Sequence, residues 1–149
     1  TERHDLNGEI LAAKFCLAPA GTGWGMRVFH VMVLGCVPVL VQDDGVHPPV
    51  QQAFAPELLD WSEFAVPVRR DQIDELPALL RAVDLPAKQA ALRRVWTRMV
   101  WRGTLSSSLR DTLPGPDAFE STIAALLSHA KPGSVPRVVA SAPAHNRTR

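Results

Sequence analysis

The feature that most constrains the fold is a glycine-rich segment between two apolar runs near the start of the chain. Phe15 to Leu17 is long enough for one buried strand, and Pro19 to Gly25 is a glycine-rich loop. Met26 to Leu34 is apolar and contains no helix breaker. Gly35 ends this segment, and Val37 to Val41 has the character of a second buried strand. Strand, glycine loop, helix and strand in this order predict a βαβ unit, and hence an α/β domain with a parallel sheet.

The loop of this unit brings the amino end of a helix to one edge of the sheet. Backbone N–H groups there lack partners and the helix dipole is positive, so an anion such as a phosphate is the natural ligand. The loop glycines Gly21, Gly23 and Gly25 let the backbone approach a ligand closely, because they have no Cβ atom. Arg27 follows at the helix start and could clamp a diphosphate through two hydrogen bonds. An exposed helix arginine with no ligand is the alternative interpretation of Arg27.

Four more candidate binding residues lie in two loops that we expect at the same edge. Trp24 could stack on a base or a sugar, or it could serve packing alone. The loop from Gln42 to Pro49 starts where the second strand ends, and ligands of open α/β sheets bind at that edge. There, the carboxylates of Asp43 and Asp44 could accept hydrogen bonds from ribose hydroxyls, and His47 could contact the ligand. A solvated loop without a ligand is the alternative.

The rest of the chain predicts further helices and one more strand. Pro67 places the expected third strand near an end or an edge of the sheet. The expected elements are a helical turn at 9–13, a short helix at 50–59, a strand at 63–68, a helix at 71–83 that becomes regular only just before Pro77, and a loop at 106–116. A further helix is expected from Pro86, with one apolar face formed by Leu92, Val95, Trp96, Met99 and Val100. An amphipathic helix is expected at 117–130, with Phe119, Ile123, Leu126 and Leu127 facing inward. We assign residues 1–13 to an upstream connection, 14–130 to the domain and 131–149 to a disordered tail.

Composition bounds the possible functions. A chain of 149 residues can form one domain with its own core. The formal charge of +1 argues against nucleic acid as a partner. No stretch approaches the roughly 18 apolar residues needed to cross a bilayer, and the polar start is not a signal peptide. The chain also lacks an initiator Met, so we expect a fragment whose membrane anchor, if any, lies outside it.

The cysteines and histidines predict neither a disulfide nor a metal site. Along two parallel strands Cys16 and Cys36 are expected too far apart for a bridge, so we expect buried free thiols. His30 lies in the apolar helix and is expected to be partly buried and hydrogen-bonded. The other histidines show no ligand spacing, so no metal or other cofactor is expected.

Spacing alone allows a dinucleotide-binding domain as an alternative. Gly21 to Asp43 is 22 residues, close to the interval between the glycines and the acidic residue of such a fold. However, Met26 occupies the place of the third glycine of the motif, and Arg27 follows at once.

Four ordered blocks of sequence resemble the C-terminal half of the exostosin family, the glycosyltransferases of family 47. The blocks are Phe15 to Gly21, Gly25 to Arg27, Gly35 to Asp43 and Leu59 to Val66. The similarity extends over roughly residues 13–100, and the Gly-Trp-Gly-Met-Arg form of the loop resembles plant or green-algal members.

The resemblance implies a GT-B enzyme, in which two Rossmann-like domains face each other across a cleft. This chain would be most of the C-terminal, donor-binding domain. It would take a nucleotide diphosphate sugar, with residues 21–27 on the diphosphate and residues 42–48 near the ribose or sugar. The acceptor would be a glycan or a glycoprotein, and the location the lumen of the Golgi apparatus, in a membrane-anchored protein. The Asn146-Arg-Thr148 sequon is consistent with that location.

Two positions depart from the family pattern. His30 stands where an Arg-x-x-Asp-Ala pattern would have aspartate, and Pro48-Pro49-Val50 stands where the family has Pro-Phe-Glu. These departures favour the alternative that the chain is a non-catalytic, degenerate exostosin-like module.

Overall fold

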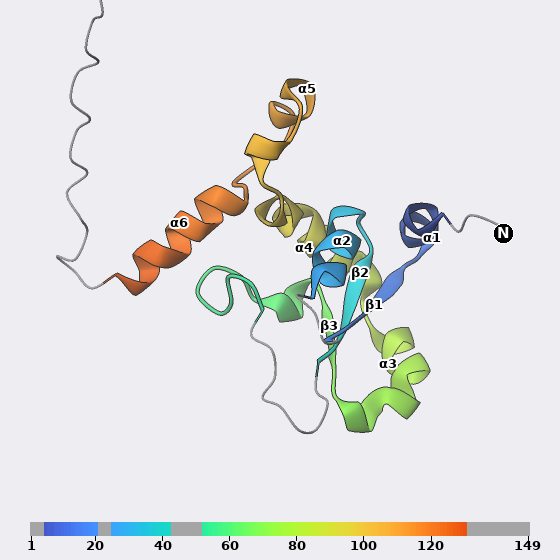
Figure 1. Ribbon diagram of the computed structural model, residues 1–149. Coiled ribbons are helices and arrows are strands. Elements are labelled where there is room, and N and C mark those ends of the chain that lie inside the picture. Colours follow the sequence, from blue (N-terminus) through green and yellow to red (C-terminus); the bar gives the residue numbers. More distant parts are fainter. Residues whose placement is uncertain (1–4, 21–24, 43–51, 131–149) are drawn as a thin grey trace, which may run out of the picture.

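The computed structural model describes residues 5–20, 25–42 and 52–130, and the predicted βαβ unit is present (Figure 1). β1 (Phe15–Pro19) and β2 (Val37–Val41) are parallel neighbours, and α2 (Met26–Val33) lies between them in sequence. Gly35, with a φ of 81°, terminates α2. The N–H of Cys36 bonds to the carbonyl of Val31, and the N–H of Gly35 to that of Met32, as in a Schellman motif.

The sheet has three parallel strands in the order β1-β2-β3. The third strand is shorter than expected, because the 3₁₀ turn η1 (Trp61–Glu63) occupies its predicted start and only β3 (Val66–Val68) pairs with β2. Pro67 has no N–H to donate, and β3 is accordingly an edge strand. A parallel sheet flanked by helices confirms the α/β class and is consistent with a Rossmann-like fold.

Most of the remaining elements follow β3 in the chain, with short connections. Pro77 lies in the first turn of its helix, as expected from its missing N–H. The helix predicted from Pro86 stays α-helical only to Val95 and then tightens into a 3₁₀ turn. The observed elements outside the sheet and α2 are α1 (Leu6–Ala12), η1 (Trp61–Glu63), η2 (Arg70–Glu75), α3 (Leu76–Ala82), α4 (Leu85–Val95), η3 (Trp96–Met99), η4 (Arg102–Thr104), α5 (Ser107–Arg110) and α6 (Ala118–His129).

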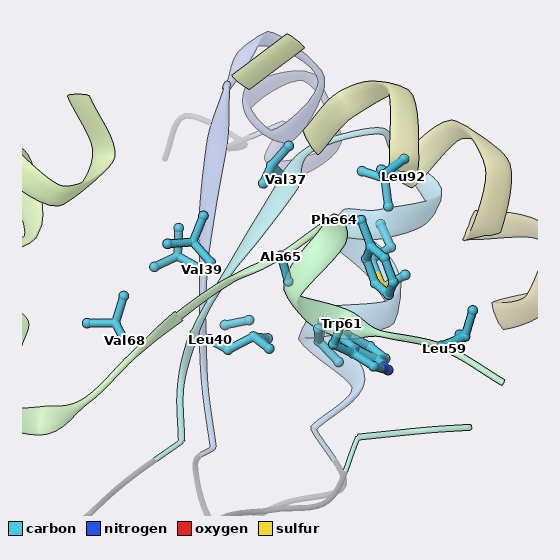
Figure 2. Close-up of a cluster of buried hydrophobic side chains, with 14 residues drawn as sticks. Val37, Val39, Leu40, Leu59, Trp61, Phe64, Ala65, Val68 and Leu92 are labelled. Carbon is cyan, nitrogen blue, oxygen red and sulfur yellow. The ribbon is translucent and has the colours of Figure 1, made fainter. Parts of the chain in front are cut away.

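The core fills both sides of the sheet. Val39 and Val68 extend to one side of the strands, and Trp61, Phe64 and Leu92 lie on the other side, toward α2 and α4 (Figure 2). The Trp61 and Phe64 rings pack at a centroid distance of 5.0 Å. Two faces of the sheet are therefore covered near β2 and β3, whereas Leu17 on the edge strand β1 remains 54% exposed.

Helix α6 is present, but its large apolar residues face the opposite way from the prediction. Ala118 and Ser121 are buried, and small residues form the inward side. Figure 1 shows α5 and α6 extending away from the part of the molecule that holds the sheet. Helical periodicity identifies an apolar stripe but not the side on which the core lies, and here that stripe is solvent-exposed. The exposed residues are Phe119, Ile123, Leu126 and Leu127.

The expectation of free thiols is wrong, because Cys16 and Cys36 form a disulfide with a Cα–Cα distance of 6.0 Å. The register pairs Phe15 with Val37, which places Cys36 level with Lys14 at the same end of the sheet as Cys16. An offset of two positions is within reach of a disulfide. Among the described residues no cysteine is free.

Two loop predictions are also corrected. Residues 52–58 form turns rather than a helix; Phe54 has a φ of 60°, and a cis peptide bond joins Ala55 to Pro56. A proline inside this segment has no N–H for a helical hydrogen bond. Within the predicted loop 106–116, Ser107–Arg110 instead forms the one-turn helix α5.

Some predictions fall outside the described residues: the tail at 131–149, the Asn146 sequon and the start of the helix predicted at 50–59. Within the described ranges, no helix is long and apolar enough to traverse a lipid bilayer.

Candidate functional site

The three strands end level with one another at one edge of the sheet. Pro19 is the register partner of Val41, and Val41 is the partner of Val68. The N–H of Ala20 continues this pairing by donating to the carbonyl of Val41 at 3.0 Å. The segments that follow β1, β2 and β3 therefore all leave from the same edge, where open α/β sheets bind ligands.

Helix α2 begins beside this edge with an open amino end. Gly25 is its N-cap residue, in the left-handed conformation with φ 66° and ψ 21°, which glycine adopts without cost. No side chain of the described residues caps the helix, and none of their atoms lies within 4 Å of where a Cβ atom at Gly25 would be. The first N–H groups of α2 are thus left for an anion to accept, and the helix dipole favours negative charge at this point.

Arg27 lies in the first turn of α2 and is exposed. Its side chain borders a hollow beside β1 and α1 that Phe15 and Leu17 also line. It makes no hydrogen bond or ion pair with any residue in the described ranges. A guanidinium that no described residue binds can bind an anion at the helix start.

The second loop, residues 43–51, is closed at its base. Gln52 Nε2 donates a hydrogen bond to Gln42 Oε1, which joins the residues on either side of the loop. The carbonyl of Ala53 accepts a hydrogen bond of 2.9 Å from Nε1 of the buried Trp61. The loop therefore starts at the end of β2 and returns to a point anchored on the core.

The structure describes two of the eight predicted binding residues, Gly25 and Arg27, and both lie at this edge. The other six fall outside the described residues: Gly21, Gly23, Trp24, Asp43, Asp44 and His47. His30 is hydrogen-bonded as expected, through Nε2 to Asn7 Oδ1 at 2.8 Å, but the expectation of partial burial is wrong because it is exposed. This hydrogen bond joins α2 to α1.

Two aromatic residues that the sequence did not single out border the same region. Phe54 and Trp101 line a pocket with Met26, the first residue of α2. Trp101 is 52% exposed. In the sequence, Trp101 directly follows the apolar positions 99 and 100 but does not belong to the helical apolar face that they end. An aromatic residue outside such a face is the sequence signal that could have marked it as a candidate.

The displaced carboxyl pKa values in the described part of the chain have structural causes. Hydrogen bonds from the side chain and backbone of Ser62 lower the pKa of Asp60. A hydrogen bond from Arg69 lowers the pKa of Asp71. Burial raises the pKa of Asp117, but backbone hydrogen bonds from Glu120, Arg102 and Phe119 outweigh it and leave that pKa lowered. These carboxylates act as caps and an ion-pair partner.

A search of the described ranges for metal ligands finds no cluster of three or more His, Cys, Asp or Glu side chains that could hold an ion. Among the described residues, helix N–H groups and the Arg27 guanidinium are the polar groups that this edge offers to a ligand.

Comparison with known proteins identifies relatives that match about half of the chain. The chain is 35% identical over 76 residues to a probable glucuronosyltransferase of Oryza sativa subsp. japonica. It is 36% identical over 76 residues to a probable β-1,4-xylosyltransferase of Arabidopsis thaliana. It is 34% identical over 85 residues to a probable glucuronoxylan glucuronosyltransferase of the same plant. These matches take in 50%, 50% and 54% of the chain, and each spans 17% of the relative's length.

The family model that matches is the exostosin GT47 domain, over residues 1–83. This range contains the sheet, the glycine-rich loop and α2. It covers more than half of the chain, and its agreement with the four sequence blocks confirms the resemblance. The chain belongs to the exostosin GT47 family.

Proposed function

We propose that this chain is the donor-binding part of a glycosyltransferase. It binds a nucleotide diphosphate sugar at the carboxyl edge of the sheet and supports transfer of the sugar to a hydroxyl group of a glycan. The printed names of the relatives, glucuronosyl- and xylosyltransferases, support a transferase activity. Because the match spans only 17% of the length of these relatives, the activity is proposed for a longer protein of which this chain supplies one part.

One observation carries the proposal: the uncapped start of α2, with Arg27 in its first turn, lies beside the level ends of three parallel strands. A diphosphate at this point accepts hydrogen bonds from helix N–H groups and the guanidinium together. Gly21, Gly23 and Trp24 complete the loop around it, and Asp43, Asp44 and His47 approach the ribose or the sugar from the neighbouring loop.

Catalysis by these groups is positioning and charge stabilisation. As the bond between the sugar and the diphosphate breaks, negative charge develops on the departing diphosphate. The helix N–H groups, which α2 holds in place, and the guanidinium of Arg27 in its first turn stabilise this charge in the transition state. The base that activates the acceptor hydroxyl comes from outside the matched segment.

The fold that suits this function is the C-terminal Rossmann-like domain of a GT-B enzyme. As an edge strand, β1 can pair with a further strand of the longer protein. The donor then lies in a cleft between this domain and a second one.

The acceptor we propose is a xylose-containing polysaccharide. The names of two relatives support this choice, because one is a probable β-1,4-xylosyltransferase and the other a probable glucuronoxylan glucuronosyltransferase. A growing or substituted polysaccharide chain is a long acceptor, so its binding needs an extended surface next to the donor.

The location we propose is the lumen of the Golgi apparatus, with the membrane anchor outside this chain. The Cys16–Cys36 disulfide supports an oxidising compartment, since structural disulfides are rare where glutathione keeps thiols reduced.

A calorimetric titration of the purified chain tests donor binding. UDP and GDP are the probes, and NAD is the control because it distinguishes a dinucleotide-binding domain. Binding of UDP or GDP without binding of NAD is the expected result. Binding of NAD alone would contradict the proposal.

The competing hypothesis is a non-catalytic module. His30, which bonds to Asn7 rather than offering a carboxylate, is the feature that favours it. In the longer protein, His30→Asp tests this idea: transfer activity that is present before the substitution and unchanged by it would show that the departure does not abolish function.

A further inference from the structure

Two hollows on the surface share one side chain, the half-exposed indole of Trp101. The first hollow is lined on its other sides by Met26, Phe54 and Arg98. The second is lined by Arg110 and Phe119, among others. Trp101 therefore stands as a ridge between two adjoining depressions rather than at the rim of a single pocket.

The exposure of this aromatic ridge is not explained by packing. Trp101 is 52% exposed and Phe119 is 57% exposed. The indole N–H of Trp101 has no hydrogen-bond partner among the described residues. An aromatic body with a free polar tip is the combination found where one side of a ligand is apolar and the other side is wet.

The charged groups around the ridge are the guanidinium groups of three arginines and two carboxylates, those of Asp117 and Glu120, which already accept backbone hydrogen bonds at the start of α6. Arg98 lines the first hollow and donates through Nη1 to Ser121 Oγ at 3.1 Å. Arg110 lines the second hollow and donates through Nη2 to the carbonyl of Leu105 at 3.2 Å. Their remaining N–H groups can donate to hydroxyl oxygens. A pyranose ring matches this pattern, because its C–H groups form apolar faces and its hydroxyls lie around the rim.

The first hollow is also lined by residues that follow closely in sequence after both loops of the proposed donor site. Met26 directly follows Gly25, the N-cap of α2. Ala53 and Phe54 directly follow Gln52, which closes the loop at 43–51. A sugar in this hollow is therefore next to the donor, and a chain of sugars that continues over Trp101 enters the second hollow.

The second hollow has the size of a small-ligand site. Its volume is about 500 Å³, within the roughly 300–1,000 Å³ of such sites. The first, at about 230 Å³, is smaller and suits a single ring.

We propose that the surface on both sides of Trp101 is the acceptor subsite, where an extended oligosaccharide stacks on the indole with its reacting end in the hollow beside Met26. This inference rests on the proposed glycosyltransferase function, which supplies the need for a polysaccharide next to the donor.

The test is binding of xylohexaose to the full 149-residue chain, measured by calorimetry and by saturation-transfer NMR. Trp101→Ala removes the stacking platform, and its affinity is expected to fall at least about tenfold. Trp101→Phe keeps an aromatic face and should retain most of the binding. Leu126→Ala is the matched control, since this residue is also exposed but lines neither hollow.

Two outcomes overturn the proposal: no binding of xylohexaose to the unsubstituted chain, or equal affinity in Trp101→Ala and Leu126→Ala. A parallel titration with UDP and GDP keeps this failure distinct from failure of the proposed function. Donor binding that persists in Trp101→Ala while xylohexaose binding is lost supports the assignment to acceptor. Loss of nucleotide binding in Trp101→Ala with unchanged xylohexaose binding would instead assign Trp101 to the nucleotide-sugar site and overturn the proposal.

Discussion

Gln52 donates a side-chain hydrogen bond to Gln42, so the chain returns after residues 43–51 to the point where it left the sheet. Gln42 directly follows β2, whose last residue pairs with the last residues of β1 and β3. The bond thus fixes both ends of a loop at the edge where α2 also begins. This convergence is the structural basis for placing a nucleotide diphosphate there.

The disulfide predicts a stability difference between oxidised and reduced protein. Cys16 and Cys36 are 20 residues apart in sequence, and closing a loop of this length stabilises a fold by about 3 kcal/mol in the chain-entropy model. Urea unfolding of the chain with and without reductant should show a loss of this size. The Cys16→Ser, Cys36→Ser double variant should resemble the reduced protein and not respond to reductant; an unchanged midpoint in the reduced wild type would contradict the prediction.

A buried leucine on α4 and an exposed leucine on α6 predict opposite outcomes for the same substitution. Leu92 on α4 is 2% exposed, and Leu92→Ala should cost about 2–5 kcal/mol because it leaves a cavity. Leu126 on α6 is 62% exposed, and Leu126→Ala should change the free energy of unfolding by less than about 0.5 kcal/mol. Denaturant unfolding of both variants checks this. Equal losses would mean that the outer face of α6 is packed in solution.

Asp117 predicts an acid-sensitive helix start. Its carboxylate accepts hydrogen bonds from the N–H groups of Glu120 and Arg102, at 2.9 and 3.1 Å, and so joins α6 to η4. Asp117→Ala should cost about 1–2 kcal/mol, whereas Asp117→Asn, which can still cap, should cost less. Thermal unfolding at neutral pH compares them. An equal loss of stability in Asp117→Asn and Asp117→Ala would contradict this prediction.

The same residue predicts the direction of a pH effect. The pKa of Asp117 is lowered in the folded state from 3.8. Its contribution to stability is therefore complete above the unfolded pKa and is lost as pH falls through the folded pKa. Between neutral pH and strong acid, Asp117→Asn should lose less stability than the wild type. A parallel pH dependence in the two proteins would rule out this role of the carboxylate.

The βαβ unit was predictable because apolar runs, glycines and a breaker-free segment all indicate the same elements. The sequence also predicts that Gly25 and Arg27 lie at the sheet edge. By contrast, the Cys16–Cys36 disulfide was missed, because it depends on the register between β1 and β2. Strand boundaries predicted from sequence are uncertain by a residue or two, and a shift of that size changes which positions of the two strands lie side by side. The pattern of apolar residues along the sequence does not specify which residues of two strands pair.

Orientation was the other limit. The stripe of Phe119, Ile123, Leu126 and Leu127 correctly indicates a helix, but periodicity cannot tell whether the apolar side meets the core of the same chain. In α6 the small residues Ala118 and Ser121 pack inward instead. Trp101 was missed for a related reason: its exposure depends on where η3 and α6 lie, which only the folded chain determines.

The most direct test of the central claim is the affinity of UDP and GDP for the wild type and for Arg27→Ala, measured by calorimetry. Arg93→Ala, an exposed helix arginine on α4, is the matched control. Charge-assisted hydrogen bonds contribute about 1.5–3 kcal/mol, so Arg27→Ala should weaken binding by about tenfold or more with an unchanged melting temperature. Arg93→Ala should bind like the wild type. Equal affinity of the Arg27→Ala and Arg93→Ala variants would contradict a diphosphate site at the start of α2.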